Sequence, residues 1–255
     1  MYQNIFDSHA HYDDERFNGD CFKLLDELFA QGLGGVINAA ISIESAKASL
    51  TLAQRYPQLY CAAGIHPDTA FSFTDADLTA LLELSREPKV IAIGEIGLDY
   101  YYDDATPREM QKIVFEKQII LANELNLPVI IHDRDAHQDT LDILRRHRPK
   151  GVLHCYSGSA EMAKEITALG LYLGFTGVVT FKNARKALEA VQAVPLNRLL
   201  IETDCPYMAP EPNRGKRCDS GMLTFTGEKL AELKGITPQE LFNATSYNAH
   251  ELFSI

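Results

Sequence analysis

Residues 5–11 read Ile-Phe-Asp-Ser-His-Ala-His, an apolar start that ends in two histidines one residue apart. On a β-strand the side chains of residues i and i+2 point to the same face, so His9 and His11 would face one small volume while Ala10 turns away. A lone His-x-His motif has two interpretations, an exposed polar terminus or part of a metal site, because short motifs often occur without a function. Further apolar runs along the chain also end in histidines or carboxylates.

Short apolar runs with β-branched residues alternate with helical patterns along the whole chain. We predict strands at residues 4–10, 35–39, 59–65, 90–96, 128–132, 151–154, 172–175 and 199–203. We predict helices at residues 21–31, 45–55, 75–86, 108–125, 139–148, 160–169, 183–194, 223–234 and 238–253. Gly32 and Gly170 mark two helix ends, and Thr237 followed by Pro238 marks a helix start.

The predicted strands are apolar on nearly every residue, which is typical of a parallel sheet covered on both faces. Eight such strands, each followed by a helix, in a chain of 255 residues favour an α/β fold, a TIM-type (β/α)8 barrel that forms a single domain over residues 1–255. An open, doubly wound sheet is the alternative, and the periodicity alone does not separate the two folds.

Six of the apolar runs end in histidines or carboxylates, always on the C-terminal side. These residues are His9, His11, His66, Glu95, Asp99, His132, His154, Glu202 and Asp204. A barrel carries its active site at the C-terminal ends of its strands, with residues from several strands. A single buried histidine is usually a satisfied core residue, but packing does not explain so many, because a buried cluster of unpaired ionisable groups is costly. The pattern therefore favours the barrel, with a metal centre at its mouth.

The types of side chain narrow the choice of metal. Histidine nitrogen and carboxylate oxygen without thiolate fit Zn, Mn, Fe or Mg at a catalytic centre, rather than a structural zinc. Candidate ligands at the ends of six apolar runs are too many for one ion that must keep an open position. They suit two divalent ions bridged by a carboxylate, ~3.5–4 Å apart, which lower the pKa of a bound water so that it becomes a nucleophile.

Composition limits the partners and the compartment. The net charge of −11 argues against a broad basic face for duplex DNA, so a nucleic acid would be held locally by metal ions and a few arginines. The apolar runs are far shorter than a membrane span, and residues 1–20 do not resemble a secretory signal. Five scattered cysteines fit a reduced, cytoplasmic environment. We expect no membrane association and no obligate protein partner.

Two of the cysteines, Cys155 and Cys205, directly follow the candidate ligands His154 and Asp204. Neighbouring residues on a strand point in opposite directions. We therefore expect both cysteines to pack in the structure and to point away from the metal centre.

Three stretches of the sequence, residues 6–13, 127–136 and 200–206, resemble the signatures of the TatD family of metal-dependent deoxyribonucleases. Residues 94–100 and 152–158 also resemble family stretches, so the resemblance covers essentially the whole chain in order. It implies a TIM-type barrel of the amidohydrolase superfamily with a two-metal site.

The resemblance also implies roles for the candidate ligands. His9, His11 and Asp204 would hold one ion, His132 and His154 the other, and Glu95 would bridge the two. Asp204 would also orient or deprotonate the attacking water. Glu202, two residues before Asp204 on the same strand face, is either a support for the ligands or a buried group bonded to the backbone.

Candidate substrate contacts are His66, Arg134 and Arg214. Arginine matches phosphate oxygens bidentately. An ion pair with a neighbouring aspartate is an equally good explanation of Arg134, and a solvated loop is the alternative for residues 214–217. The tyrosines at 100–102 offer stacking faces for bases or form a packed loop, and we favour the packed loop.

The resemblance predicts a divalent-metal-dependent deoxyribonuclease that hydrolyses phosphodiesters at DNA ends, in the manner of a 3′-5′ exonuclease, with single strands favoured. Mg or Mn would support the nuclease activity, and Zn or another transition metal is an alternative. A two-metal amidohydrolase that acts on an amide, ester or lactone of a small molecule is the second hypothesis, because a fold does not fix a function. A non-enzymatic adaptor that retains its ligands is the third.

The chain departs from the family pattern in one loop. After residues 214–216, relatives usually continue with Asn, then Glu or Gln, then Pro, whereas residues 217–221 read Arg-Cys-Asp-Ser-Gly here. No predicted metal ligand is lost. The loop borders the predicted entrance of the site, so substrate choice is the property that this departure would change.

Overall fold

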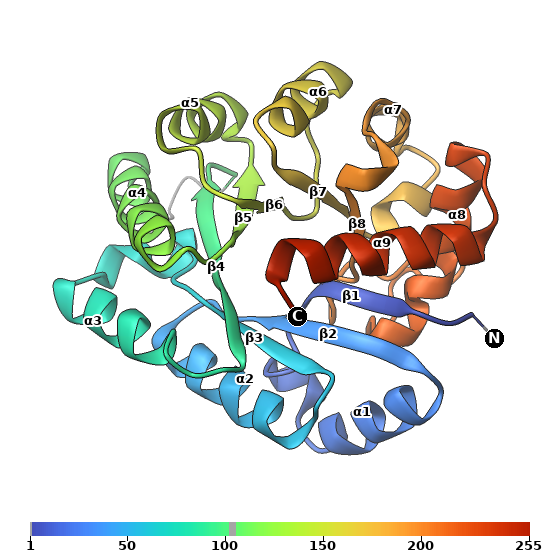
Figure 1. Ribbon diagram of the computed structural model, residues 1–255, viewed down its shortest axis with the longest axis horizontal. Helices are drawn as coiled ribbons and strands as arrows, with labels where there is room; N and C mark the ends of the chain where they lie inside the picture. Colours follow the sequence, from blue (N-terminus) through green and yellow to red (C-terminus); the bar gives the residue numbers. More distant parts are fainter. Residues whose placement is uncertain (1, 102–105) are drawn as a thin grey trace.

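The computed structural model describes residues 2–101 and 106–255, and in this part of the chain eight strands form one parallel sheet in sequence order (Figure 1). The strands are β1 (Ile5–Ala10), β2 (Leu33–Ala39), β3 (Leu59–Ala63), β4 (Val90–Asp99), β5 (Val129–Arg134), β6 (Gly151–Leu153), β7 (Tyr172–Phe175) and β8 (Leu199–Ile201). Each strand overlaps a predicted one, although several strand ends differ.

The first and last strands meet, which nearly closes the sheet into a barrel. Ala10 and Cys205 form a parallel β-bridge, and the backbone N–H of His11 donates to the carbonyl of Cys205 at 2.8 Å. The N–H of Asp204 donates to the carbonyl of His9 at 3.0 Å. An open doubly wound sheet would leave its outer strands apart. The predicted TIM-type barrel is therefore confirmed, and the open sheet is excluded.

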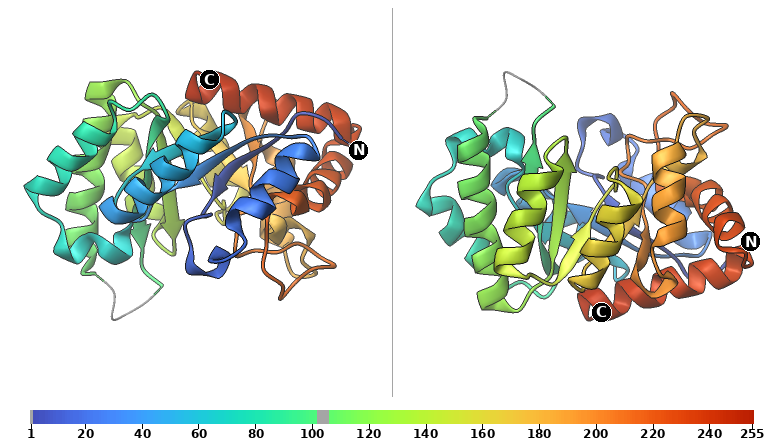
Figure 2. Two further views of the ribbon diagram at one scale, coloured as in Figure 1. Left: turned by 90° about the horizontal axis from the view of Figure 1, so that it is seen from below. Right: turned by 90° about the horizontal axis from the view of Figure 1, so that it is seen from above.

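Helices surround the ring of strands (Figures 1 and 2). The helices are α1 (Cys21–Ala30), α2 (Ile43–Arg55), α3 (Asp75–Leu84), α4 (Arg108–Leu125), α5 (His137–His147), α6 (Ala160–Ala168), α7 (Arg185–Ala193), α8 (Leu223–Lys234) and α9 (Pro238–Phe253). Short 3-10 helices are η1 (Glu15–Phe17), η2 (Pro67–Ser72), η3 (Gly177–Thr180), η4 (Leu196–Arg198) and η5 (Ser220–Met222).

Several element ends differ from the predicted ones for identifiable reasons. Helix α2 begins two residues before the predicted start, because the hydroxyl of Ser42 accepts the N–H of Ser45 and caps it. Strand β4 continues three residues past its predicted end, since it stays paired with β5 as far as Asp99 opposite Arg134. The Thr237–Pro238 start of α9 is confirmed, with Glu240 completing a capping box.

Two apolar layers fix which end of the barrel is open. The larger layer packs strands against the helices, and the smaller one fills the inside of the ring. Ile130 of β5 and Val152 of β6 belong to the inner layer, which Leu252 and Phe253 of α9 cover at the N-terminal ends of the strands (Figure 2). His132 lies two positions after Ile130, and His154 lies two positions after Val152, directly after the end of β6. Both therefore face the inside at the opposite, C-terminal mouth.

None of the helices within residues 2–101 and 106–255 is long and apolar enough to cross a bilayer. The five cysteines are free thiols.

Candidate metal centre

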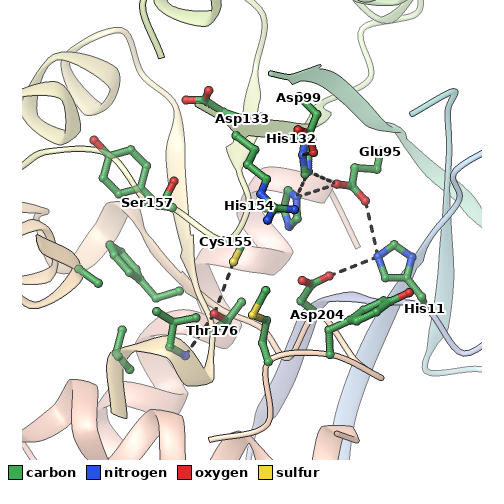
Figure 3. Close-up of a pocket in the computed structure, with 18 of the residues that line it drawn as sticks. His11, Glu95, Asp99, His132, Asp133, His154, Cys155, Ser157, Thr176 and Asp204 are labelled. Carbon is green, nitrogen blue, oxygen red and sulfur yellow. Dashed lines mark hydrogen bonds and ion pairs between the residues drawn. The ribbon is translucent and has the colours of Figure 1, made fainter. Parts of the chain in front are cut away.

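Ligand-capable side chains from β1, from β4 and from the residues that follow β1 and β8 meet at the mouth of the barrel (Figure 3). The Nε2 atoms of His9 and His11 are 3.0 Å apart, so the two imidazoles do converge. Glu95 Oε2 lies 3.3 Å from the former and 3.5 Å from the latter. Asp204 Oδ1 lies 3.7 and 3.3 Å from the same two atoms. Four ligand atoms thus surround one point.

The other oxygen of Glu95 faces a second histidine pair, from β5 and from the residue directly after β6. Glu95 Oε1 lies 2.8 Å from His132 Nδ1 and 2.7 Å from His154 Nε2, and these nitrogens are 3.2 Å apart. His66, which we predicted as a substrate contact, lies in this group, with its Nε2 atom 3.6 Å from the same oxygen. Glu95 therefore stands between two sets of donors.

The arrangement fits metal ions better than hydrogen bonding alone. A neutral imidazole has a single N–H, yet His9 Nε2 lies within 3.7 Å of three ligand atoms, those of His11, Glu95 and Asp204. Zn–N distances of 2.0–2.1 Å place tetrahedral ligands about 3.4 Å from one another, close to the separations in the first group. Three overlapping sets of ligands lie within metal-binding reach: His9, His154 and Asp204; His9, His11 and Glu95; His66, Glu95 and His132.

Polar groups on the side away from the cluster orient the imidazole rings of His11 and His132. His11 Nδ1 lies 2.8 Å from the carbonyl of Ala39, and His132 Nε2 lies 3.0 Å from Asp99 Oδ2. These bonds leave the opposite nitrogen of each ring free to face the cluster. The sequence pattern placed Asp99 at a strand end without giving it a role. Its position four residues after Glu95 on an extended strand is the signal that could have assigned one.

Burial and close charges set the protonation of the cluster. Burial alone would raise the pKa of Glu95, but His154, His9 and His66 outweigh it and hold this pKa well below its usual range. Burial opposes protonation of His132, yet hydrogen bonds to Asp99 and Glu95 raise its pKa to about 10. Burial lowers the pKa of His9 to about 4. The carboxylate of Glu95 is therefore ionised, which is the form that binding of a metal ion requires.

Glu202 combines the two predicted alternatives for it. Its carboxylate is completely buried and accepts the backbone N–H of Cys155 and the hydroxyl of Ser8, the latter at 3.1 Å. The same carboxylate lies 3.7 Å from His154 Nδ1. Burial raises the pKa of Glu202 to about 7. The residue thus joins the loop after β6 to β1 and also faces a candidate ligand.

The expected orientation of Cys155 is wrong. Its side chain lines the same cavity as His154, and its thiol lies 3.6 Å from the hydroxyl of Thr176 (Figure 3). Strand β6 ends at Leu153, and Cys155 has a φ of 42°, so the alternation of a strand does not apply to it. Cys205 is fully buried where the barrel closes, as expected for a packing residue.

The predicted arginines differ in their relation to the cavity. Arg134 lines it and lies over the ring of Tyr101, with its guanidinium carbon 3.8 Å from the ring centroid. Arg214 stacks on Phe181 at 4.4 Å, in the loops that follow β7 and β8. The predicted packed loop is formed in part, because Tyr100 donates to Asp139 at 2.7 Å while Tyr101 is 54% exposed. Tyr102 lies outside the described residues.

Comparison with known proteins identifies the family. The family described as "TatD related DNase" matches residues 6–254. The chain belongs to the TatD family. The predicted membership is confirmed, and the chain is therefore a metal-dependent hydrolase by family.

Three relatives illustrate how similar this chain is to proteins of the TatD family. An uncharacterised metal-dependent hydrolase, YabD of Bacillus subtilis, is 41% identical over 98% of this chain and 99% of its own. The TatD protein of Salmonella typhimurium, named a 3′-5′ ssDNA/RNA exonuclease, is 33% identical over 98% and 99% of the two chains. The crystal structure of the TatD homologue YjjV from Escherichia coli superposes with a TM-score of 0.93 at 33% identity, covering 100% of both chains.

Proposed function

We propose that this TatD-family hydrolase cleaves phosphodiester bonds at the 3′ ends of single-stranded DNA with the help of two divalent cations. The supporting observation is that Glu95 presents one carboxylate oxygen to each of two groups of donors. In this proposal His9, His11 and Asp204 hold one cation and His132 and His154 hold the other, with Glu95 between them. Glu202 and Asp99 support these ligands.

Two divalent cations, when bound, polarise a phosphoryl oxygen and lower the pKa of a water molecule. Asp204 would accept the proton of that water, a role supported by its side chain being 13% exposed at the cavity whereas that of Glu95 is only 3% exposed. Burial alone would raise the pKa of Asp204, but the hydrogen bond with His11 and the charges of His154 and His9 together lower it, so its carboxylate is ionised. Glu95 contributes as a fixed, ionised bridge.

Single strands and ends fit the charge of the molecule. The chain carries a net charge of −11, so a long duplex would be repelled by most of its surface. Arg134, Arg185 and Lys186 line the cavity and supply local positive charge. A Salmonella relative named a 3′-5′ ssDNA/RNA exonuclease supports the same choice of substrate. A cytoplasmic location remains a prediction from the scattered cysteines.

The proposal is tested with protein purified without added metal and treated with a chelator. A single-stranded oligonucleotide labelled at its 5′ end should stay intact, and addition of Mg or Mn should restore stepwise shortening from the 3′ end. Zn is tested in parallel, together with single-stranded RNA. His132→Ala should lose at least 10²-fold in rate, because it removes a ligand and leaves Glu95 partly unpaired. A full rate in this variant contradicts the proposal.

The small-molecule hypothesis is tested in the same assay. Acylated amino acids and lactones are offered under each metal beside the oligonucleotide. Turnover of one of these compounds with no turnover of DNA assigns the site to an amide, ester or lactone substrate. Stoichiometric binding of a partner without turnover of any compound assigns it to an adaptor.

A further inference from the structure

The cavity at the mouth of the barrel extends well beyond the candidate metal centre. It has a volume of about 770 Å³, within the ~300–1,000 Å³ typical of ligand sites. Strand β7 contributes none of the proposed metal ligands, yet residues from 175 to 187, on and after this strand, line a large part of the cavity. One side of the cavity is therefore formed by a segment that the proposed metal chemistry does not use.

The β7 wall is the name that we give to the apolar residues on this side of the cavity, which Thr176 and Asn183 also line. It consists of Phe175, Val178, Val179, Ala184, Ala187 and Met208. Phe175 and Val179 are each 1% exposed, whereas Met208 is 39% exposed at the rim. Tyr156 lines the cavity beside Phe175, with ring centroids 6.1 Å apart. The surface that the wall offers to a ligand is therefore mainly that of Val178 and Met208, because Phe175 and Val179 are nearly covered.

The β7 wall is held firmly by the chain that follows β8. A Cβ added at Gly177 would lie 2.2 Å from the carbonyl oxygen of Met208, so η3 rests directly on that backbone. The backbone N–H of Glu211 donates to the hydroxyl of Thr180 at 2.8 Å. Because both ends of η3 are fixed, the wall is formed before any ligand arrives, which lowers the entropy cost of binding.

Positive charge lies at the edge of the β7 wall. Arg185 and Lys186 occupy the first turn of α7, which contains no acidic residue, and both line the cavity. Arg185 pairs with Glu189 at 2.8 Å, and its side chain is 89% exposed. Arg134 lines the cavity from β5. An apolar surface beside cations matches a ligand that joins a flat apolar group to several anionic groups.

We propose that the β7 wall binds the 3′-terminal nucleobase of a single-stranded nucleic acid, while Arg185 and Lys186 attract the phosphates beside it. The inference rests on the proposed nuclease function and adds a substrate contact to it. A nucleotide combines a flat base with an anionic phosphodiester, and the cavity combines the wall with the candidate metal centre. Contacts with the base are independent of sequence, because every base has a flat face that packs on apolar and aromatic side chains.

The test compares two single-stranded oligonucleotides that differ only at the 3′ end, one with a terminal thymidine and one with a terminal abasic residue. The wild-type protein should show a KM roughly tenfold or more higher for the abasic end, in line with the loss of one base contact. Equal KM values for the two ends overturn the inference. Cleavage of neither oligonucleotide instead refutes the proposed nuclease function.

Two variants locate the contact on the wall. Val178→Asp and Met208→Asp place a negative charge on the wall at positions that are partly open to solvent. Each should bring the KM ratio of the two oligonucleotides close to one. The control is Ile120→Asp, the same kind of change on α4, where Ile120 is 45% exposed, and it should keep the wild-type ratio. Selectivity that survives in both wall variants refutes the assignment.

A binding measurement decides the inference without turnover. Thymidine 5′-monophosphate and deoxyribose 5-phosphate share the phosphate and the sugar, and only the former has a base. Titration calorimetry with metal-loaded protein should give a Kd roughly tenfold lower for the mononucleotide, and this difference should disappear in Met208→Asp. Equal affinity of the wild-type protein for the two compounds overturns the inference even where no oligonucleotide is cleaved.

Discussion

Nε2 of His132 lies 3.0 Å from Oδ2 of Asp99, and this contact turns Nδ1 of the same ring toward Glu95. Both residues lie near the ends of neighbouring strands, where Gly97 of β4 pairs with His132 of β5. The orientation of a candidate ligand is thus set by strand register and one carboxylate.

Asp99→Asn tests this contact. The amide is uncharged and holds the imidazole less firmly, so we expect affinity for the cation to fall about 10–100-fold, measured by competition with a metallochromic chelator. Asp133→Asn on the neighbouring strand β5 is the matched control, because Asp133 pairs with His137 at 2.8 Å. An equal loss of affinity in the two variants would show that the Asp99 contact has no special part in metal binding.

Metal removal should lower thermal stability. A ligand that binds only the folded state at 100 times its Kd adds about 2.7 kcal/mol, which for a chain of 255 residues corresponds to a rise in Tm of roughly 5–10 °C. We expect this rise when Zn or Mn is added to chelator-treated protein in differential scanning fluorimetry. Glu95→Ala should abolish most of the rise, and an unchanged Tm in the wild-type protein would speak against a metal centre.

Cation binding should release protons. Burial lowers the pKa of His132, but Asp99 and Glu95 more than reverse this and raise it to about 10, so the metal-free ring is protonated at neutral pH. A cation must displace that proton, so affinity should fall as the pH is lowered. Titration calorimetry in two buffers of different ionisation enthalpy should give different apparent enthalpies. Identical enthalpies would mean that no proton leaves.

A buried clamp joins the first strand to the segments around β8. Asp7 is completely buried and accepts the hydroxyls of Thr203 and Ser220, each at 2.6 Å, and the N–H of Thr203 at 2.9 Å. The hydroxyl of Tyr12 lies 2.7 Å from the hydroxyl of the same Ser220. Ser220 belongs to the loop that departs from the family pattern, so this loop contributes a contact to the barrel.

Asp7→Ala removes the acceptor of this clamp and leaves several buried donors unpaired. We expect a loss of about 1–3 kcal/mol in the free energy of unfolding, measured by urea denaturation. Ser220→Ala removes one hydrogen bond and should cost about 1 kcal/mol. A smaller loss for Asp7→Ala than for Ser220→Ala would contradict the clamp.

The order of elements could be predicted from the sequence because most of the strands contain a run of apolar residues. Such runs are typical of strands that are buried on both faces, and Val129-Ile130-Ile131 before His132 is an example. The convergence of the candidate ligands followed from the same pattern, since parallel strands end at one mouth.

Other features depend on contacts between segments that lie far apart in the sequence. The extension of β4 to Asp99 needs its pairing with β5, and the orientation of Cys155 needs the early end of β6. The β7 wall has no motif at all, because Val178 and Ala187 acquire their meaning only from the cavity they line. Patterns of local sequence contain no information about such neighbours.

The β-bridge between Ala10 and Cys205 has a consequence for biosynthesis. His9 and His11 leave the ribosome long before Asp204, which follows them by more than 190 residues in the sequence. The ligand set that includes all three is therefore assembled late, and a truncated translation product that ends before β8 lacks it. The proposed hydrolytic activity therefore requires translation to continue beyond β8.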